Sequence, residues 1–141
     1  ISRAYQKVLD DGSLAPADDL RLGDRILVTL EIQSPRSAAY AAIEDPLPCV
    51  LEAVNPDFKS RETAGATQAH GNLWADYREM RGDKIVWFRD QLRPGTWRIA
   101  YLARARAVGT AIAPPARIAE MYRPERLGTS DAQTLTVAPG P

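Results

Sequence analysis

The chain has 141 residues, 45% of them hydrophobic, which predicts one domain, residues 1–141, able to bury its own core. Eighteen Lys and Arg balance eighteen Asp and Glu, so the basic surface that nucleic acids and anionic membranes require is not expected. A single cysteine, Cys49, and a single histidine, His70, exclude an internal disulfide bond and a multi-cysteine metal site. We therefore expect no metal and no cofactor.

The N-terminus and the hydropathy of the chain bear on its origin. No apolar run approaches the 18 residues that a membrane helix needs, so membrane insertion is not expected. The first residues, Ile1-Ser2-Arg3, contain neither an initiator Met nor the start of a signal peptide. The sequence is therefore interpreted as a fragment of a longer protein.

Eleven prolines and nine glycines separate short apolar segments, a pattern typical of many short β-strands. In chain order, the first strand is expected at Arg3–Leu9. The clearest strand is Arg25–Ile32, where every second residue is a large aliphatic one that would face a core. A strand at Ala38–Ile43 follows, and Asp45-Pro46 is expected to form the turn that ends it.

The second half of the chain predicts three more strands. Lys84–Asp90 and Trp97–Val108 are expected to pair as a hairpin, because Gln91–Gly95 between them contains the Pro-Gly sequence of a turn. Asn55–Asn72 is polar and aperiodic, and is expected to be a mobile loop. Thr134–Val137 is a plausible last strand. About seven or more antiparallel strands in one domain predict an all-β, two-sheet sandwich.

Catalytic motifs are absent from the sequence, which contains no phosphate-binding glycine loop, no nucleophile elbow and no zinc-binding H-E-x-x-H. A catalytic triad would have to combine His70 with Ser60 or Cys49. His70 is instead expected to be a solvated loop residue, and Cys49, with no basic neighbour within three residues, a packed structural thiol. Glu44 and Asp45 would point to opposite faces of a strand and cannot form a carboxylate pair. The sequence predicts that the domain is not an enzyme.

Two groups of residues suggest binding surfaces. The row Arg98, Arg104 and Arg106 could bind an anion, but pairing with nearby carboxylates on a solvated strand face is the preferred interpretation. Exposed aromatic residues can stack on sugars, so a carbohydrate-binding or adhesion module that uses Trp74 and Tyr77 is the alternative function. The remaining tryptophans, Trp87 and Trp97, are expected in the core.

The segment Ala113–Pro124 carries Ile118, Met121 and Tyr122 between prolines that exclude it from a central strand. These three side chains are either tucked under the edge of the sandwich or displayed. Composition favours the tucked arrangement, because large apolar side chains normally lie inside. Display would mark a contact with another protein.

Several motifs follow one another in order through residues 3–137. They are Leu22-Gly23-Asp24, Ile43-Glu-Asp-Pro-Leu-Pro48, Asp83-Lys-Ile-Val-Trp-Phe88, Pro114-Pro115 and Glu120-Met121-Tyr122. In this order the motifs resemble the C-terminal macroglobulin domain of bacterial alpha-2-macroglobulins, which is equivalent to the receptor-binding domain of the animal inhibitors and complement proteins. Each motif is weak alone, and the series covers nearly the whole chain.

The resemblance implies an immunoglobulin-like sandwich without catalytic activity in a periplasmic parent protein that traps proteases and is commonly lipid-anchored. The implied partners are a thioester domain and other macroglobulin domains of the same chain, and proteases through the parent. It also implies that Met121 and Tyr122 contact the thioester domain and shelter the thioester, where the parent has one. A thioether beside a phenol ring offers an apolar cover with one polar group.

Overall fold

The computed structural model describes residues 1–54 and 77–140. These residues form thirteen β-strands and no helix. Glycine or proline lies close to most strand ends, as the punctuation of the sequence predicts. The strands are β1 Ser2–Val8, β2 Leu14–Pro16, β3 Leu20–Arg21, β4 Arg25–Ser34, β5 Ala38–Pro46, β6 Leu51–Ala53, β7 Tyr77–Met80, β8 Lys84–Leu92, β9 Gly95–Ala105, β10 Gly109–Ala113, β11 Arg117–Glu120, β12 Arg123–Thr129 and β13 Gln133–Ala138.

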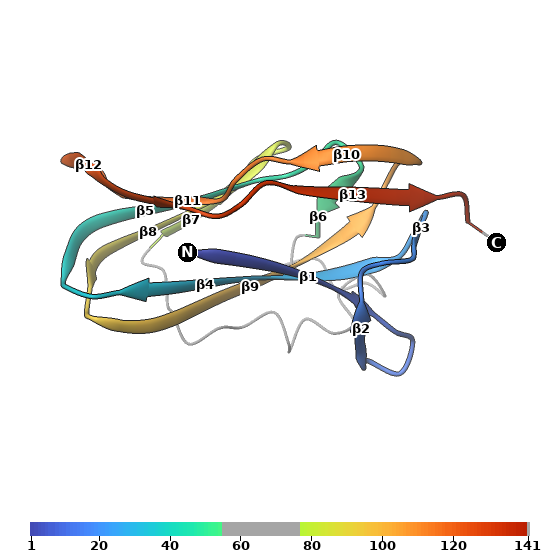
Figure 1. The fold of residues 1–141 in the computed structure, drawn as a ribbon, viewed down its shortest axis with the longest axis horizontal. Helices are drawn as coiled ribbons and strands as arrows, with labels where there is room; N and C mark the ends of the chain where they lie inside the picture. The colour runs from blue at the N-terminus through green and yellow to red at the C-terminus, as the bar shows by residue number, and fades with distance from the viewer. Residues whose placement is uncertain (55–76, 141) are drawn as a thin grey trace.

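The strands lie in two layers that face each other (Figure 1). One layer is a sheet of order β2-β1-β4-β9-β6, and the opposite layer contains the sheet β12-β11-β5-β8-β7 together with the smaller sheet β10-β13-β3. Among the described strands every pairing is antiparallel except the short contact between β3 and β13. The predicted all-β, immunoglobulin-like sandwich is therefore confirmed.

The core lies between the two layers and is built by alternating residues of β4 and β9, while Leu27 and Leu102 are buried in a separate, smaller cluster. Every second residue of β4 from Ile26 to Ile32 is buried, and so is every second residue of β9 from Ile99 to Ala105. The strands β5 and β8 supply the opposing surface. Its large side chains are Ile43, Ile85 and Trp87, and the last of these lies against Tyr101 with ring centroids 5.8 Å apart. The apolar residues whose alternation predicted these strands are the residues that face the core.

The predicted hairpin between β8 and β9 is wrong. β8 pairs with β5 and β7, whereas β9 pairs with β4 and β6 in the other layer. The connection between them crosses from one layer to the other, and Gly95 adopts a φ of 141° in it, which disfavours other residues. The Trp97 indole N–H donates a hydrogen bond to the Arg93 carbonyl, 2.8 Å away, across this crossing.

Two smaller predictions are also corrected. Asp45-Pro46 does not form a turn but belongs to the last part of β5, and the Asp45 side chain is fully buried. Cys49 is exposed in the turn before β6 and is not a packed thiol. Trp87 is buried as predicted, and Trp97 packs partly against the core. The predicted loop at Asn55–Asn72, with Ser60 and His70, lies outside the described residues, as does Trp74.

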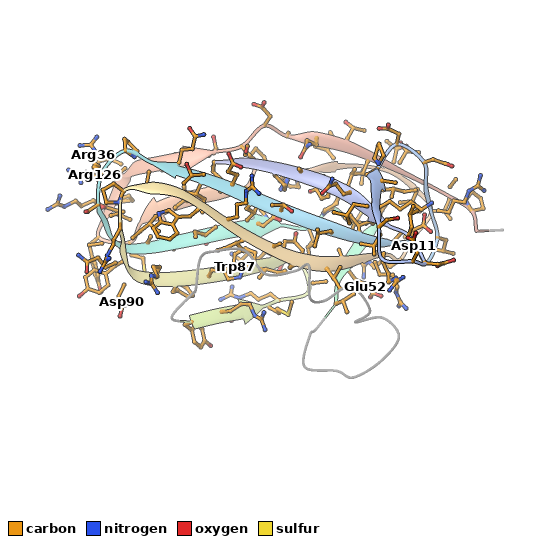
Figure 2. The ribbon with its side chains drawn as sticks, turned by 90° about the horizontal axis from the view of Figure 1, so that it is seen from below. Asp11, Arg36, Glu52, Trp87, Asp90 and Arg126 are labelled. Carbon is orange, nitrogen blue, oxygen red and sulfur yellow. The ribbon has the colours of Figure 1, made fainter. Side chains whose placement is uncertain are left out.

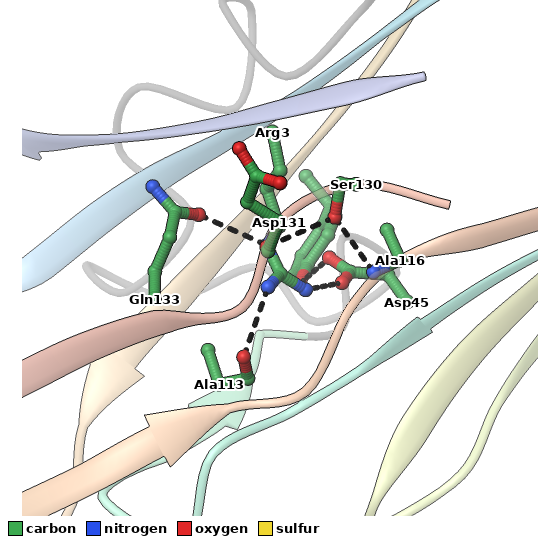
Figure 3. Close-up of polar contacts among 8 residues, drawn as sticks. Arg3, Asp45, Ala113, Ala116, Ser130, Asp131 and Gln133 are labelled. Atoms are coloured by element: carbon green, nitrogen blue, oxygen red, sulfur yellow. Dashed lines mark hydrogen bonds and ion pairs between the residues drawn. The ribbon is translucent and has the colours of Figure 1, made fainter. Parts of the chain in front are cut away.

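A buried ion pair connects the two layers (Figure 3). The Arg3 guanidinium, from β1, contacts the Asp45 carboxylate of β5 at 2.5 Å, and both side chains are inaccessible to solvent. The Tyr101 hydroxyl, from β9, donates to the other oxygen of Asp45. The Arg3 Nε–H donates to the Gln133 side-chain oxygen and Nη2 donates to the Ala113 carbonyl, each at 3.3 Å. Every member of the network thus has a hydrogen-bonding partner.

Burial sets the energetics of this network. It raises the pKa of the Asp45 carboxyl, while the hydrogen bond from Tyr101 and the charge of Arg3 counteract the rise. Burial and the neighbouring carboxylate raise the pKa of the Tyr101 phenol well above its usual value. The guanidinium also lies 5.3 Å from the centre of the Tyr5 ring, within cation–π range. Removal of one charged partner would leave the other buried and unpaired, which is the costly case for a buried ion pair.

We predict that Asp45→Asn lowers the free energy of unfolding by about 3–5 kcal/mol, because it leaves the Arg3 charge without its carboxylate. The matched control is Glu52→Gln, which removes the half-exposed partner of Arg104 and should cost no more than about 1 kcal/mol. Urea denaturation followed by circular dichroism measures both values. Equal, small effects would show that the buried pair does not hold the layers together.

Candidate functional site

Met121 and Tyr122 form the turn between β11 and β12, at one end of the sandwich (Figure 1). The Met121 N–H donates to the Tyr40 carbonyl at 2.9 Å, so the turn continues the ladder between β11 and β5 by one residue. On its other side the register between β11 and β12 shifts after Ala119, so that Glu120 lies opposite Arg123. The turn is thus held to β5 while the start of β12 bulges away.

The side chains of this turn are displayed. Met121 is 51% exposed and Tyr122 is 77% exposed. Ile118, by contrast, packs against the main core. The tucked arrangement that composition favoured is therefore right for Ile118 and wrong for Met121 and Tyr122. Strand alternation accounts for Met121, because Ile118 and Glu120 face inward and Ala119 and Met121 face outward. Tyr122 lies beyond the end of β11, in the turn, where the alternation no longer applies.

Tyr40 supports Tyr122 from β5. Its ring meets the Tyr122 ring edge to face, with centroids 5.2 Å apart and an interplanar angle of 88°. Tyr40 has a φ of 52°, and among the described non-glycine residues it alone lies in the left-handed region. Such a conformation costs about 1–3 kcal/mol and persists only where the surrounding structure imposes it. The sequence Ala-Ala-Tyr-Ala-Ala reads as an ordinary strand and gives no signal of it.

Glu120 anchors the base of the turn. Its carboxylate is almost completely buried, and one oxygen accepts a hydrogen bond from the Ala39 N–H at 3.1 Å. The other oxygen lies 3.8 Å from the Arg126 guanidinium. One side chain of β11 is thus tied to β5 and β12, so the base of the turn is fixed on both sides.

Met121 and Tyr122 border different hollows. Met121 borders one of about 140 Å³ on the outer face of the sheet, together with Ala42, Ala119 and Pro124. Tyr122 borders a cleft of about 330 Å³ at the end of the sandwich, which is also lined by Tyr40, Gln91, Glu120, Arg123 and Arg126. Figure 2 labels Arg126, Arg36 and Asp90 at this end of the sandwich. We call the exposed group Tyr40, Met121 and Tyr122 the Met-Tyr turn.

The predicted arginine row does not form an anion site. Arg98 pairs with Glu31 at 3.2 Å and Arg104 pairs with Glu52 at 2.5 Å, as the preferred interpretation expected. The Arg106 guanidinium donates to the Cys49 carbonyl at 3.0 Å.

Metal-ligating groups, membrane helices and the predicted carbohydrate site concern the remaining surface. Residues 1–54 and 77–140 hold no group of three or more metal-ligating side chains and no helix able to span a membrane. Tyr77 is exposed and its ring lies 5.8 Å from that of Phe88. Trp74, the other residue of the predicted carbohydrate site, lies outside the described residues, so that alternative stays a prediction.

A family model for the bacterial alpha-2-macroglobulin MG10 domain matches residues 1–125. The chain belongs to this family. An alpha-2-macroglobulin homolog from Nostoc sp. is 35% identical over 119 residues, which are 84% of this chain and 6% of the relative. The chain is therefore similar to a small part of a much longer protein, and it is a macroglobulin domain, which is a non-catalytic type of domain.

Solved structures agree with this assignment. Trypsin-activated alpha-2-macroglobulin from Escherichia coli matches with a TM-score of 0.80 and 28% identity, over 98% of this chain and 10% of that one. Salmonella alpha-2-macroglobulin reacted with methylamine matches with a TM-score of 0.74 and 27% identity, over 98% of this chain and 9% of that one. The MG10 domain described here thus spans a tenth or less of each of these proteins.

We predict that Met121→Ala and Tyr122→Ala each change the free energy of unfolding of this MG10 domain by less than about 1.5 kcal/mol. Tyr122 would lose only its edge-to-face contact with Tyr40, and Met121 is half-exposed. Trp87→Ala, which empties a core position, should cost about 3–5 kcal/mol. Chemical denaturation of the three variants tests whether the Met-Tyr turn is dispensable for folding.

Proposed function

We propose that this MG10 domain is the non-catalytic terminal domain of a periplasmic, lipid-anchored alpha-2-macroglobulin that traps proteases. In this proposal the domain packs through Met121 and Tyr122 against the thioester domain of the same chain and shelters the thioester where the parent has one. The observation that carries the proposal is the display of a Met and a Tyr side chain on a turn whose base is fixed by Glu120.

Two similar proteins support this proposal, one because trypsin activates it and the other because it has been reacted with an amine. The Escherichia coli protein is activated by trypsin, a protease, and the Salmonella protein has been reacted with methylamine, a primary amine. Amines attack thioesters at the acyl carbon, which forms an amide and releases the thiol. A parent with the same chemistry would need to keep water and amines from its thioester until a protease arrives.

The exposed turn suits such a sheltering role chemically. Hydrolysis requires water to add to the acyl carbon, after which the carbon–sulfur bond breaks and leaves a carboxylic acid and a thiol. A thioether and a phenol ring placed over the bond would displace that water, because both have large apolar surfaces. The Tyr122 hydroxyl would keep a polar contact at the rim of the cover.

The rigid base of the turn favours tight packing. Tyr40 holds the Tyr122 ring from one side, and the Met121 N–H is fixed by its hydrogen bond to Tyr40. A contact surface that is ordered before binding loses less conformational entropy when the partner arrives. The exposed side chains therefore need little rearrangement to cover a neighbouring domain.

We predict that the double substitution Met121→Ala and Tyr122→Ala, in a full-length parent that contains a thioester, raises the rate of spontaneous thiol release at least about tenfold, the effect of about 1.4 kcal/mol of lost contact. A thiol-reactive dye measures the release over time. The matched control is Ile112→Ala, which removes a 67% exposed side chain on β10. Release at the wild-type rate in the double variant would disprove the sheltering role.

A further inference from the structure

The two displayed side chains of the Met-Tyr turn face chemically different surroundings. Met121 borders the hollow on the outer face of the sheet, whereas Tyr122 borders the cleft at the end of the sandwich. The two hollows share only Glu120 among their lining residues. Their contents therefore indicate what kind of partner surface would fit on each side of the turn.

The hollow beside Met121 has an apolar floor. Ala42 and Ala119 lie opposite each other in the register of β5 and β11, so two methyl groups form its floor. Met121 and Pro124 border it as well. Three charged residues also line it. Glu44 and Arg117 lie opposite each other in the register, and the Glu120 carboxylate already accepts the Ala39 N–H and lies near Arg126. This hollow fits an uncharged, apolar side chain.

The cleft beside Tyr122 is basic. Arg123 and Arg126 line it against one carboxylate, that of Glu120. That carboxylate already accepts the Ala39 N–H and lies near Arg126. The Arg123 side chain has no polar partner among residues 1–54 and 77–140 and is exposed beside the two tyrosine rings. A guanidinium fork of this kind pairs with a carboxylate, and Arg next to Tyr is typical of the residues that dominate binding energy at interfaces.

We infer that the thioester domain meets this turn with two different elements, an apolar side chain that enters the hollow beside Met121 and a carboxylate that pairs with Arg123 beside Tyr122. The inference rests on the proposed function, which supplies the partner, and adds the chemistry of the partner's surface. The Met-Tyr turn then lies between these two elements of the partner. Each element should be removable without loss of the other.

Two single substitutions in the full-length, thioester-containing parent test the inference. Ala42→Leu adds an isopropyl group to the floor of the hollow and should exclude the apolar side chain. Arg123→Glu reverses the charge in the cleft and should speed thiol release by about tenfold or more, given the strength of close interfacial charge pairs. Arg123→Lys keeps the charge but loses the fork and should give an intermediate rate. In the wild type, but not in Arg123→Glu, added salt should also speed the release.

Matched controls place the same changes elsewhere. Ala132→Leu alters an exposed alanine between β12 and β13, and Arg78→Glu reverses an exposed charge on β7, at the opposite edge of the sheet. Both should release thiol at the wild-type rate. Urea denaturation of every variant confirms that it is folded.

The outcomes separate this inference from the proposed function. If the double substitution at Met121 and Tyr122 speeds thiol release but Ala42→Leu, Arg123→Glu or both do not, the two-element surface is overturned and the sheltering role stands. If none of the substitutions has an effect, both are overturned. If Ala42→Leu or Arg123→Glu changes self-association by size-exclusion chromatography and leaves thiol release unchanged, the partner is a second copy of the chain and the inference is wrong.

Discussion

The buried contact between Arg3 and Asp45 is the interaction on which the geometry of the β11–β12 unit depends. Asp45 lies in β5, the strand that also carries Tyr40 and pairs with β11. The same guanidinium donates to Ala113, which precedes β11, and to Gln133, which follows β12. One arginine from the first strand thus fixes both chain ends of the β11–β12 unit. Ser130 adds to this anchor through two hydrogen bonds with Ala116, at 2.8 and 2.9 Å.

This arrangement separates stability from recognition within one unit. The base of the unit is buried and held by the hydrogen bonds of Arg3 and Ser130, whereas its tip carries exposed side chains that are held by Glu120 and Tyr40. Buried networks of this kind specify one arrangement because a shifted strand would leave charges unpaired. The tip can therefore present an apolar surface to a partner while the buried hydrogen bonds at the base of the unit fix the backbone.

The fold was largely predictable from the sequence, because alternation along β4 and β9 states which residues face the core. The pairing of strands was not, since Gln91–Gly95 has the composition of a hairpin turn and yet crosses between layers. Asp45 illustrates a second limit. Next to Pro46 it resembles a turn residue, and only Arg3 and Tyr101, distant in sequence, give its carboxylate a place inside. Local sequence carries no record of partners 42 and 56 residues away.

The candidate site, like the fold, was only partly predictable from the sequence. Family resemblance singled out Met121 and Tyr122, whereas composition favoured burying them. Met121 is exposed because Ile118 and Glu120 face inward, and Tyr122 because β11 ends at Glu120 and a turn follows. A four-residue strand is too short for sequence periodicity to establish either position. The role of Tyr40 had no signal at all. Its left-handed backbone arises where β5 meets the turn, and no pattern in Ala-Ala-Tyr-Ala-Ala distinguishes it from its neighbours.

The edge position of β12 decides how a partner can bind here. β12 is the last strand of its sheet, and open edges commonly accept another strand. The start of this strand resists such pairing, because Pro124 lacks an N–H, Arg123 and Arg126 are charged, and the register breaks after Ala119. A partner at this end therefore has side chains, not backbone, to recognise. That constraint favours contacts made by side chains, such as those of the Met-Tyr turn and Arg123, over the addition of a strand at this edge.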